Sequence, residues 1–78
     1  MNEKELQLLK QLAEKIKSRR LQLNLSQEAL ANKSGLDRTY ISLVERGKRN
    51  PSYLSLIKLC DGLEIDIKEL LGVKDDYK

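Results

Sequence analysis

The spacing of hydrophobic residues along the chain predicts short amphipathic helices. Between residues 3 and 22, apolar side chains recur every three or four positions, as they do on the buried side of a surface helix. The same stripe includes an arginine, so we expect a charged side chain on the buried side of this first helix. The stripe consists of Leu6, Leu9, Ala13, Ile16, Arg20 and Leu23.

Capping residues divide the rest of the chain into four more helices. Asn24 suits the left-handed position at the end of the first helix. Asp66 and Glu69 have the D-x-x-E spacing of a capping box. The predicted N-caps of the second to fifth helices are Ser26, Asp37, Ser52 and Asp66, and Gly35, Gly47 and Gly72 follow three of these helices.

Each of the next three helices carries apolar residues that we expect to face a core. They are Ala29, Leu30 and Ala31 in the second, Ile41 and Val44 in the third, and Leu54, Ile57, Leu59 and Cys60 in the fourth. No segment favours a strand. The sequence therefore predicts an all-α domain of five helices over residues 1–78, with its core in about 15–72 and a frayed tail at 73–78.

Composition and charge suggest the kind of partner. The chain has 78 residues, is 40% hydrophobic and 35% charged, and carries a net charge of +3. Residues 1–50 hold eleven Lys or Arg and six Asp or Glu, whereas residues 51–78 hold four and six. A basic front favours a polyanion partner, although ordinary solvated surface is the alternative. A core this small also favours dimerisation, which buries further apolar surface.

The residue types present argue against an enzyme, a cofactor or a metal site. There is no His for acid–base chemistry and no Gly-rich phosphate loop. Cys60 is the only cysteine and lies in an apolar run, so we expect a buried structural thiol without disulfide or metal. No long apolar span is present, and we expect a cytoplasmic protein that makes no contact with a membrane.

The third predicted helix, residues 37–46, presents a polar face. If Ile41 and Val44 point inward, Arg38 and the residues opposite the core point outward. An α-helix fits the DNA major groove, where Arg can donate two hydrogen bonds to guanine and an apolar side chain can contact a thymine methyl. For Arg38 and Leu43 the alternative is a plain surface residue. The predicted base-contacting residues are Arg38, Thr39, Ser42 and Leu43.

Polar and basic residues flank this face at both ends. Gln27 begins the second helix, where an amide can meet a phosphate beside the helix N-terminus. Tyr40 can donate its hydroxyl to a phosphate or stack locally. For Lys48 and Arg49 the alternative is a solvated loop. The predicted phosphate-contacting residues are Gln27, Tyr40, Arg46, Lys48, Arg49 and Asn50.

The segments "LSQEALA", "ISLVERGKRNPS" and "IDIKELLG", with Gly35 at the turn, resemble the Xre-type, lambda-repressor-like family of helix-turn-helix DNA-binding domains. The stretch around "LDRTYIS" is most similar to controller proteins of restriction–modification systems. The resemblance implies a five-helix fold, a base-reading third helix and an ion pair between Arg20 and Glu45. Where the family often has glycine after the fourth helix, this chain has Glu64, so we expect that helix to end sooner or to bend.

The resemblance also implies a transcription regulator acting as a homodimer on double-stranded DNA. A two-fold dimer would read a palindrome with its recognition helices about 34 Å apart. The predicted interface consists of Tyr53, Ile65, Ile67, Leu70 and Leu71; the alternative is that some of these residues close the bundle of a single domain. RNA polymerase is a further candidate partner, through Glu28 or Asp37. The alternative function is a protein-interaction module or antitoxin-type subunit with the same fold.

Overall fold

The computed structural model describes residues 1–72 and forms five α-helices there, without a strand. The predicted tail, residues 73–78, lies outside the described residues. The all-α fold is therefore confirmed for this part of the chain. The helices are α1 (Glu3–Gln22), α2 (Gln27–Ser34), α3 (Arg38–Glu45), α4 (Tyr53–Leu63) and α5 (Ile67–Leu71).

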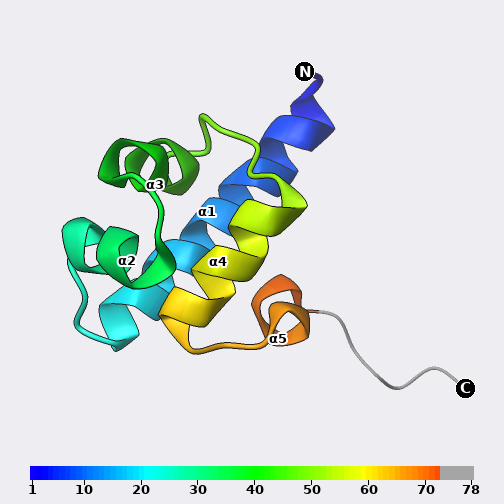
Figure 1. Cartoon of the computed structure of the whole chain (residues 1–78). Helices are drawn as coiled ribbons and strands as arrows, with labels where there is room; N and C mark the ends of the chain where they lie inside the picture. The colour runs from blue at the N-terminus through cyan, green and yellow to red at the C-terminus, as the bar shows by residue number, and fades with distance from the viewer. Residues whose placement is uncertain (73–78) are drawn as a thin grey trace, which may run out of the picture.

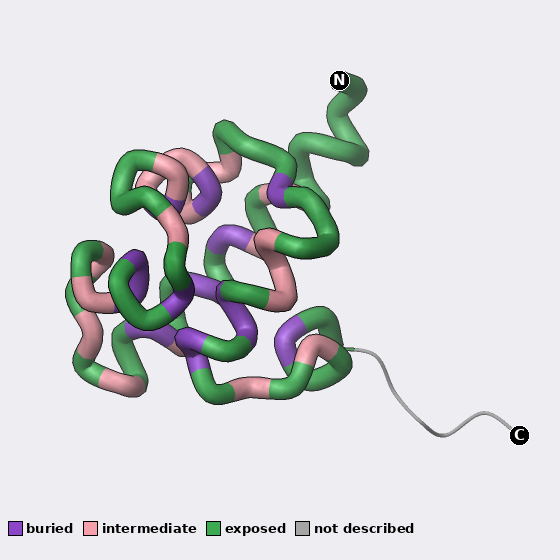
Figure 2. Tube along the Cα trace, viewed as in Figure 1, coloured by how far each residue is buried: buried purple, intermediate pink, exposed green. Residues whose placement is uncertain are grey.

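The helices pack around the long α1. α4 lies beside α1, α2 packs against α4 and α3, α3 packs against α1, and α5 closes on α1 and α4 (Figure 1). The first turns of α1 project beyond the other helices, and residues 1–8 are exposed (Figure 2). Leu6 is therefore 47% exposed, which corrects its predicted place in the buried stripe. The stripe is buried at Ala13, Ile16 and Arg20, where other helices cover it, and Leu9 and Leu23 are half-buried.

Of the residues that the periodicity placed in the core on α2, α3 and α4, six lie there, whereas Ala29 and Ile57 are only half-buried and lie outside the core cluster. The six are Leu30, Ala31, Ile41, Val44, Leu59 and Cys60. Leu30, Ile41 and Leu59 are completely buried, and each such side chain contributes about 1.5–3 kcal/mol by leaving water. Cys60 is buried as predicted, and burial raises the pKa of its thiol. The prediction that Leu54 faces the core was wrong, because Leu54 lies on the first turn of α4 and is 70% exposed.

The capping residues act largely as predicted. Ser26 and Ser52 accept hydrogen bonds from the backbone of Ala29 and Ser55 at 3.0 and 3.1 Å. Asn24 adopts the left-handed conformation, with φ 58°. At α5, Asp66 is the N-cap as predicted, but the predicted capping box of Asp66 and Glu69 is not formed. Asp66 accepts from the amide of Lys68 at 2.9 Å, one residue before the amide that a capping box uses.

The end of α4 differs from the prediction. The helix neither stops early nor breaks at Gly62, and it continues to Leu63. Glu64 then takes the left-handed conformation that glycine would favour, with φ 53°. Arg19 supports this turn by donating to the carbonyls of Leu63 and Glu64 at 2.9 and 3.0 Å, and Lys33 pairs with the Glu64 carboxylate at 2.7 Å. These contacts offset the cost of the left-handed backbone, which is about 1–2 kcal/mol for a residue other than glycine.

Gly62 lets α2 and α4 approach each other closely. A Cβ atom at this position would lie 3.0 Å from Cδ1 of Leu30 and 3.1 Å from Cβ of Ser34, both on α2. No side chain at Gly62 therefore separates the backbone of α4 from α2.

Candidate nucleic-acid interface

α2 and α3 form a two-helix unit joined by a short turn. Gly35 takes the left-handed conformation with φ 70°, as its position in the sequence predicted. The amide of Leu36 donates to the carbonyl of Ala31 at 3.0 Å, which closes the end of α2. Asp37 then caps α3 by accepting from the amide of Thr39 at 2.9 Å. Such a short link forces the two helices to cross steeply, as in a helix-turn-helix.

The outward face of α3 is open. Ile41 and Val44 are buried against the core, at 0% and 2% exposure, and thereby orient the helix. Arg38, Thr39 and Arg46 are exposed, while Ser42 and Leu43 are half-buried. Within residues 1–72, the side chains of Arg38, Thr39 and Ser42 form no hydrogen bond or ion pair, so their donors and acceptors are available to a ligand.

The start of α2 and the start of α3 share one concave surface. A depression there is lined by Arg20, Ser26, Gln27, Glu28 and Arg38. Gln27 is half-buried in this surface and Arg38 lies exposed. The geometry brings a predicted phosphate-contacting residue and a predicted base-contacting residue to the same side of the molecule.

A basic loop follows α3. Lys48, Arg49 and Asn50 are exposed, as a loop that meets solvent or a polyanion must be. The Arg49 guanidinium lies 5.4 Å from the centroid of the Tyr40 ring, a cation–π contact that restrains the arginine. Tyr40 therefore makes the local stacking contact that was one of its two predicted roles.

α1 supports this loop from behind. Gly47 has φ 68°, and a Cβ atom there would lie 3.4 Å from Cγ of Lys10. Sequence reasoning missed this contact, because nothing in the pattern of residues links the exposed start of α1 to the loop. A groove between the two is lined by Glu3, Leu6, Gln7 and Lys10 with Arg46, Gly47 and Lys48.

The ion pair expected between α1 and α3 is present. Arg20 donates from Nε to Oε2 of Glu45 at 2.7 Å and from Nη2 to Oε1 at 2.9 Å. Its Nη1 donates to the carbonyl of Leu25 at 2.7 Å. The side chains of Arg20 and Glu45 are only 9% and 2% exposed, and the hydrogen bond to Glu45 raises the pKa of Arg20. A further contact was not predicted: Gln27 donates from Nε2 to Oε1 of Glu45 at 3.1 Å.

The residues predicted for a dimer interface are split by the structure. Tyr53 and Leu71 are exposed, at 69% and 41%, and Ile65 and Ile67 are half-buried against the core. Leu70 is 2% exposed and belongs to the core, so its assignment to an interface was wrong. The spacing of apolar residues on a helix as short as α5 did not separate these two roles.

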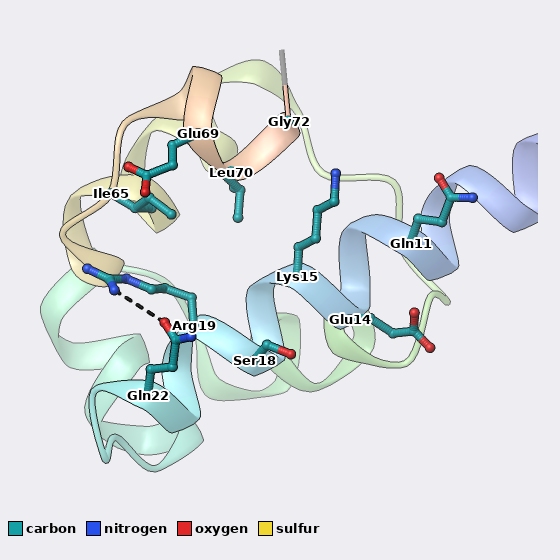
Figure 3. A pocket seen from close by; sticks show the side chains of 10 residues that line it. All are labelled: Gln11, Glu14, Lys15, Ser18, Arg19, Gln22, Ile65, Glu69, Leu70 and Gly72. Carbon is teal, nitrogen blue, oxygen red and sulfur yellow. Dashed lines mark hydrogen bonds between the residues drawn. The ribbon is translucent and has the colours of Figure 1, made fainter. Parts of the chain in front are cut away.

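A second depression lies between α1 and α5 (Figure 3). None of its lining residues comes from α2 or α3. Arg19 in its wall donates to Gln22 at 3.3 Å as well as to the end of α4, so its hydrogen bonds are used to hold the fold. Residues 1–72 contain no cluster of side chains suited to a metal ion. Among the five helices of this region, none combines the length and apolarity needed to cross a membrane.

Comparison with known proteins identifies the class of this two-helix unit. Residues 16–70 match the helix-turn-helix family model. Control protein C.SmaI of Serratia marcescens is 47% identical over 68 residues, which cover 83% of this chain and 81% of that protein. The crystal structure of the restriction-modification controller protein C.AhdI from Aeromonas hydrophila matches with a TM-score of 0.78 and 44% identity, over 80% of this chain and 94% of that one.

A further match is the restriction-modification controller protein C.Esp1396I, crystallised as a tetramer in complex with its natural 35 base-pair operator. It has a TM-score of 0.76 and 45% identity, and the match covers 82% of this chain and 88% of that one. The resemblance to Xre-type regulators and controller proteins is therefore confirmed, and the chain belongs to the helix-turn-helix family.

Proposed function

We propose that this protein is a sequence-specific double-stranded DNA-binding transcriptional regulator of the controller type. The observation that carries the proposal is the orientation of α3. Burial of Ile41 and Val44 turns Arg38 and Thr39 to solvent with their hydrogen-bonding groups unused in the described residues. The relatives named as control proteins, one of them crystallised on its operator, support the same function.

In this proposal α3 enters the major groove. Arg38 donates two hydrogen bonds to a guanine, Thr39 and Ser42 bond to neighbouring base edges, and Leu43 contacts a thymine methyl. Contacts to phosphate come from both flanks of the helix and supply affinity without sequence choice. The residues that make them are Gln27, Tyr40, Arg46, Lys48, Arg49 and Asn50.

The protein acts as a homodimer on a palindromic operator. Support comes from the exposed Tyr53 and Leu71, with the half-buried Ile65 and Ile67 beside the core. Leu54, on the first turn of α4, is a further exposed apolar residue, at 70%. The protein works in the cytoplasm, where it is a binding protein rather than an enzyme. Contact with RNA polymerase, through Glu28 or Asp37, is a finer part of the same proposal.

The test is selection of duplexes from a random pool by the purified protein, followed by sequencing. We expect a motif with two-fold symmetry and half-sites about one helical turn apart. The affinity for selected duplexes should fall steeply with salt. The proposal is contradicted if the selected duplexes share no motif, or if the affinity for DNA does not depend on salt. Either result would favour a module that binds protein partners.

A further inference from the structure

The Glu45 carboxylate binds more than the arginine that neutralises it. Arg20 donates to both of its oxygens, at 2.7 and 2.9 Å, in a site where the glutamate side chain is 2% exposed. Oε1 accepts an additional hydrogen bond from Nε2 of Gln27 at 3.1 Å. Because Arg20 already balances the charge, the contact with Gln27 is not needed to neutralise Glu45.

The Glu45–Gln27 contact links the start of α2 to the end of α3, the two ends of the helix-turn-helix unit that lie farthest from the turn in sequence. Gln27 is the first residue of α2, and Glu45 is the last residue of α3. At the other end of α2, the Gly35 turn connects the two helices through the chain itself. Gln27 also lines the depression that contains Arg38. The contact therefore fixes a side chain beside the proposed DNA-reading surface.

The chemistry of the carboxylate decides which way the amide of Gln27 faces. An ionised carboxylate accepts hydrogen bonds and donates none. The amide must turn its NH₂ group toward Glu45, because the reversed orientation would place its oxygen against another acceptor. One N–H is used in this contact, and the second N–H of the same group remains as a donor. Phosphate oxygens are acceptors, so the remaining N–H suits a DNA backbone.

We propose that Glu45 is a positioning residue for DNA binding, acting through Gln27: its buried carboxylate holds the Gln27 amide as a donor to one backbone phosphate in each half-site. This inference rests on the proposed function. Gln27 is uncharged, so it releases no counterion. Its loss should lower affinity without changing the dependence on salt.

The experiment uses a duplex selected by the wild-type protein, with single phosphates replaced in turn by uncharged methylphosphonate. At the phosphate that Gln27 contacts, the replacement should weaken wild-type binding about two- to ten-fold. For Gln27→Met, the replacement at that phosphate should leave the affinity unchanged, whereas replacement at the other phosphates should weaken binding as it does for the wild type. We expect Glu45→Met, which removes both acceptor oxygens, to lose sensitivity at the same phosphate and to keep the wild-type response at the others. Glu14→Met, the same substitution on the exposed side of α1, is the matched control and should keep the full wild-type profile.

Glu45→Met leaves Arg20 buried without its counter-charge and lowers stability. The double variant Arg20→Met with Glu45→Met removes the carboxylate without leaving an unpaired charge and is tested in parallel. The inference is overturned if either Glu45 variant keeps the wild-type response at the Gln27 phosphate. It is also overturned if Gln27→Met stays sensitive at every phosphate, or if the Glu45 variants weaken all phosphate contacts equally. Failure of the wild-type protein to select any duplex overturns the proposed function, and this inference with it.

Discussion

Removal of Arg20 alone tests how firmly the recognition helix is held to the rest of the domain. Arg20→Met keeps an aliphatic side chain on the buried side of α1 but deletes the guanidinium. Three hydrogen bonds are lost, two to Glu45 and one to the carbonyl of Leu25. The Glu45 carboxylate stays 2% exposed in the folded protein unless the structure rearranges, and only the neutral amide of Gln27 still donates to it.

The size of the effect follows from this burial. Removing one partner of a buried ion pair costs about 3–5 kcal/mol. A domain of this length has a total stability of about 4–12 kcal/mol, from about 0.05–0.15 kcal/mol per residue. The single substitution therefore removes a large part of the stability. At about 4–8 °C per kcal/mol for a domain this small, the melting temperature should fall by about 12–40 °C.

Thermal unfolding followed by far-ultraviolet circular dichroism measures the change. Arg20→Met with Glu45→Met is the matched comparison, because an apolar pair leaves no charge to desolvate and should recover most of the lost stability. The reasoning is refuted if Arg20→Met costs less than about 1 kcal/mol, the range of an exposed ion pair. It is equally refuted if the double variant is no more stable than the single one.

Three further predictions concern single side chains. Arg38→Ala should reduce discrimination at one or two base pairs by about 1–3 kcal/mol, measured on the selected duplex and its single-base variants; an equal loss on random DNA would rule out base reading. Arg49→Ala should weaken binding to all duplexes and reduce the slope of log affinity against log salt by about one; an unchanged slope would exclude a phosphate contact. The hydrogen bond from Lys33 lowers the pKa of Glu64 in the folded protein. This ion pair therefore stabilises the fold above the ordinary glutamate pKa of 4.5, and the stabilisation is lost as pH falls through the pKa of Glu64 in the folded protein. The difference in melting temperature between wild type and Glu64→Gln should therefore disappear in acid, and a difference independent of pH would contradict this.

Local rules predicted much of the fold from the sequence. Capping residues such as Ser26 and Asp37 act within one turn of the chain, so their roles depend little on distant residues. The inward direction of Ile41 and Val44 followed from helical periodicity, and with it the exposed face of α3. These short-range features predicted the exposed face of α3, on which the proposed site is built.

The features that were missed depend on contacts between distant segments. Leu6 and Leu54 fit the helical pattern, but each lies on a part of its helix that no neighbour covers. The end of α4 is stabilised at Glu64 by Arg19 and Lys33, which lie 45 and 31 residues away in the chain. The contact between Gln27 and Glu45 joins residues 18 apart. Periodicity and capping patterns carry no information about such pairs.

The close approach at Gly62 has a consequence for the spacing of binding sites. Because Gly62 carries no side chain, the backbone of α4 packs directly against Leu30 and Ser34 of α2, and such close-packed contacts deform little. Two copies joined through α4 would hold their α3 helices at a nearly fixed separation. One inserted base pair changes the distance between half-sites by about 3.4 Å and also rotates one about the duplex axis, so such a dimer should reject operators whose central spacer is a single base pair too long or too short.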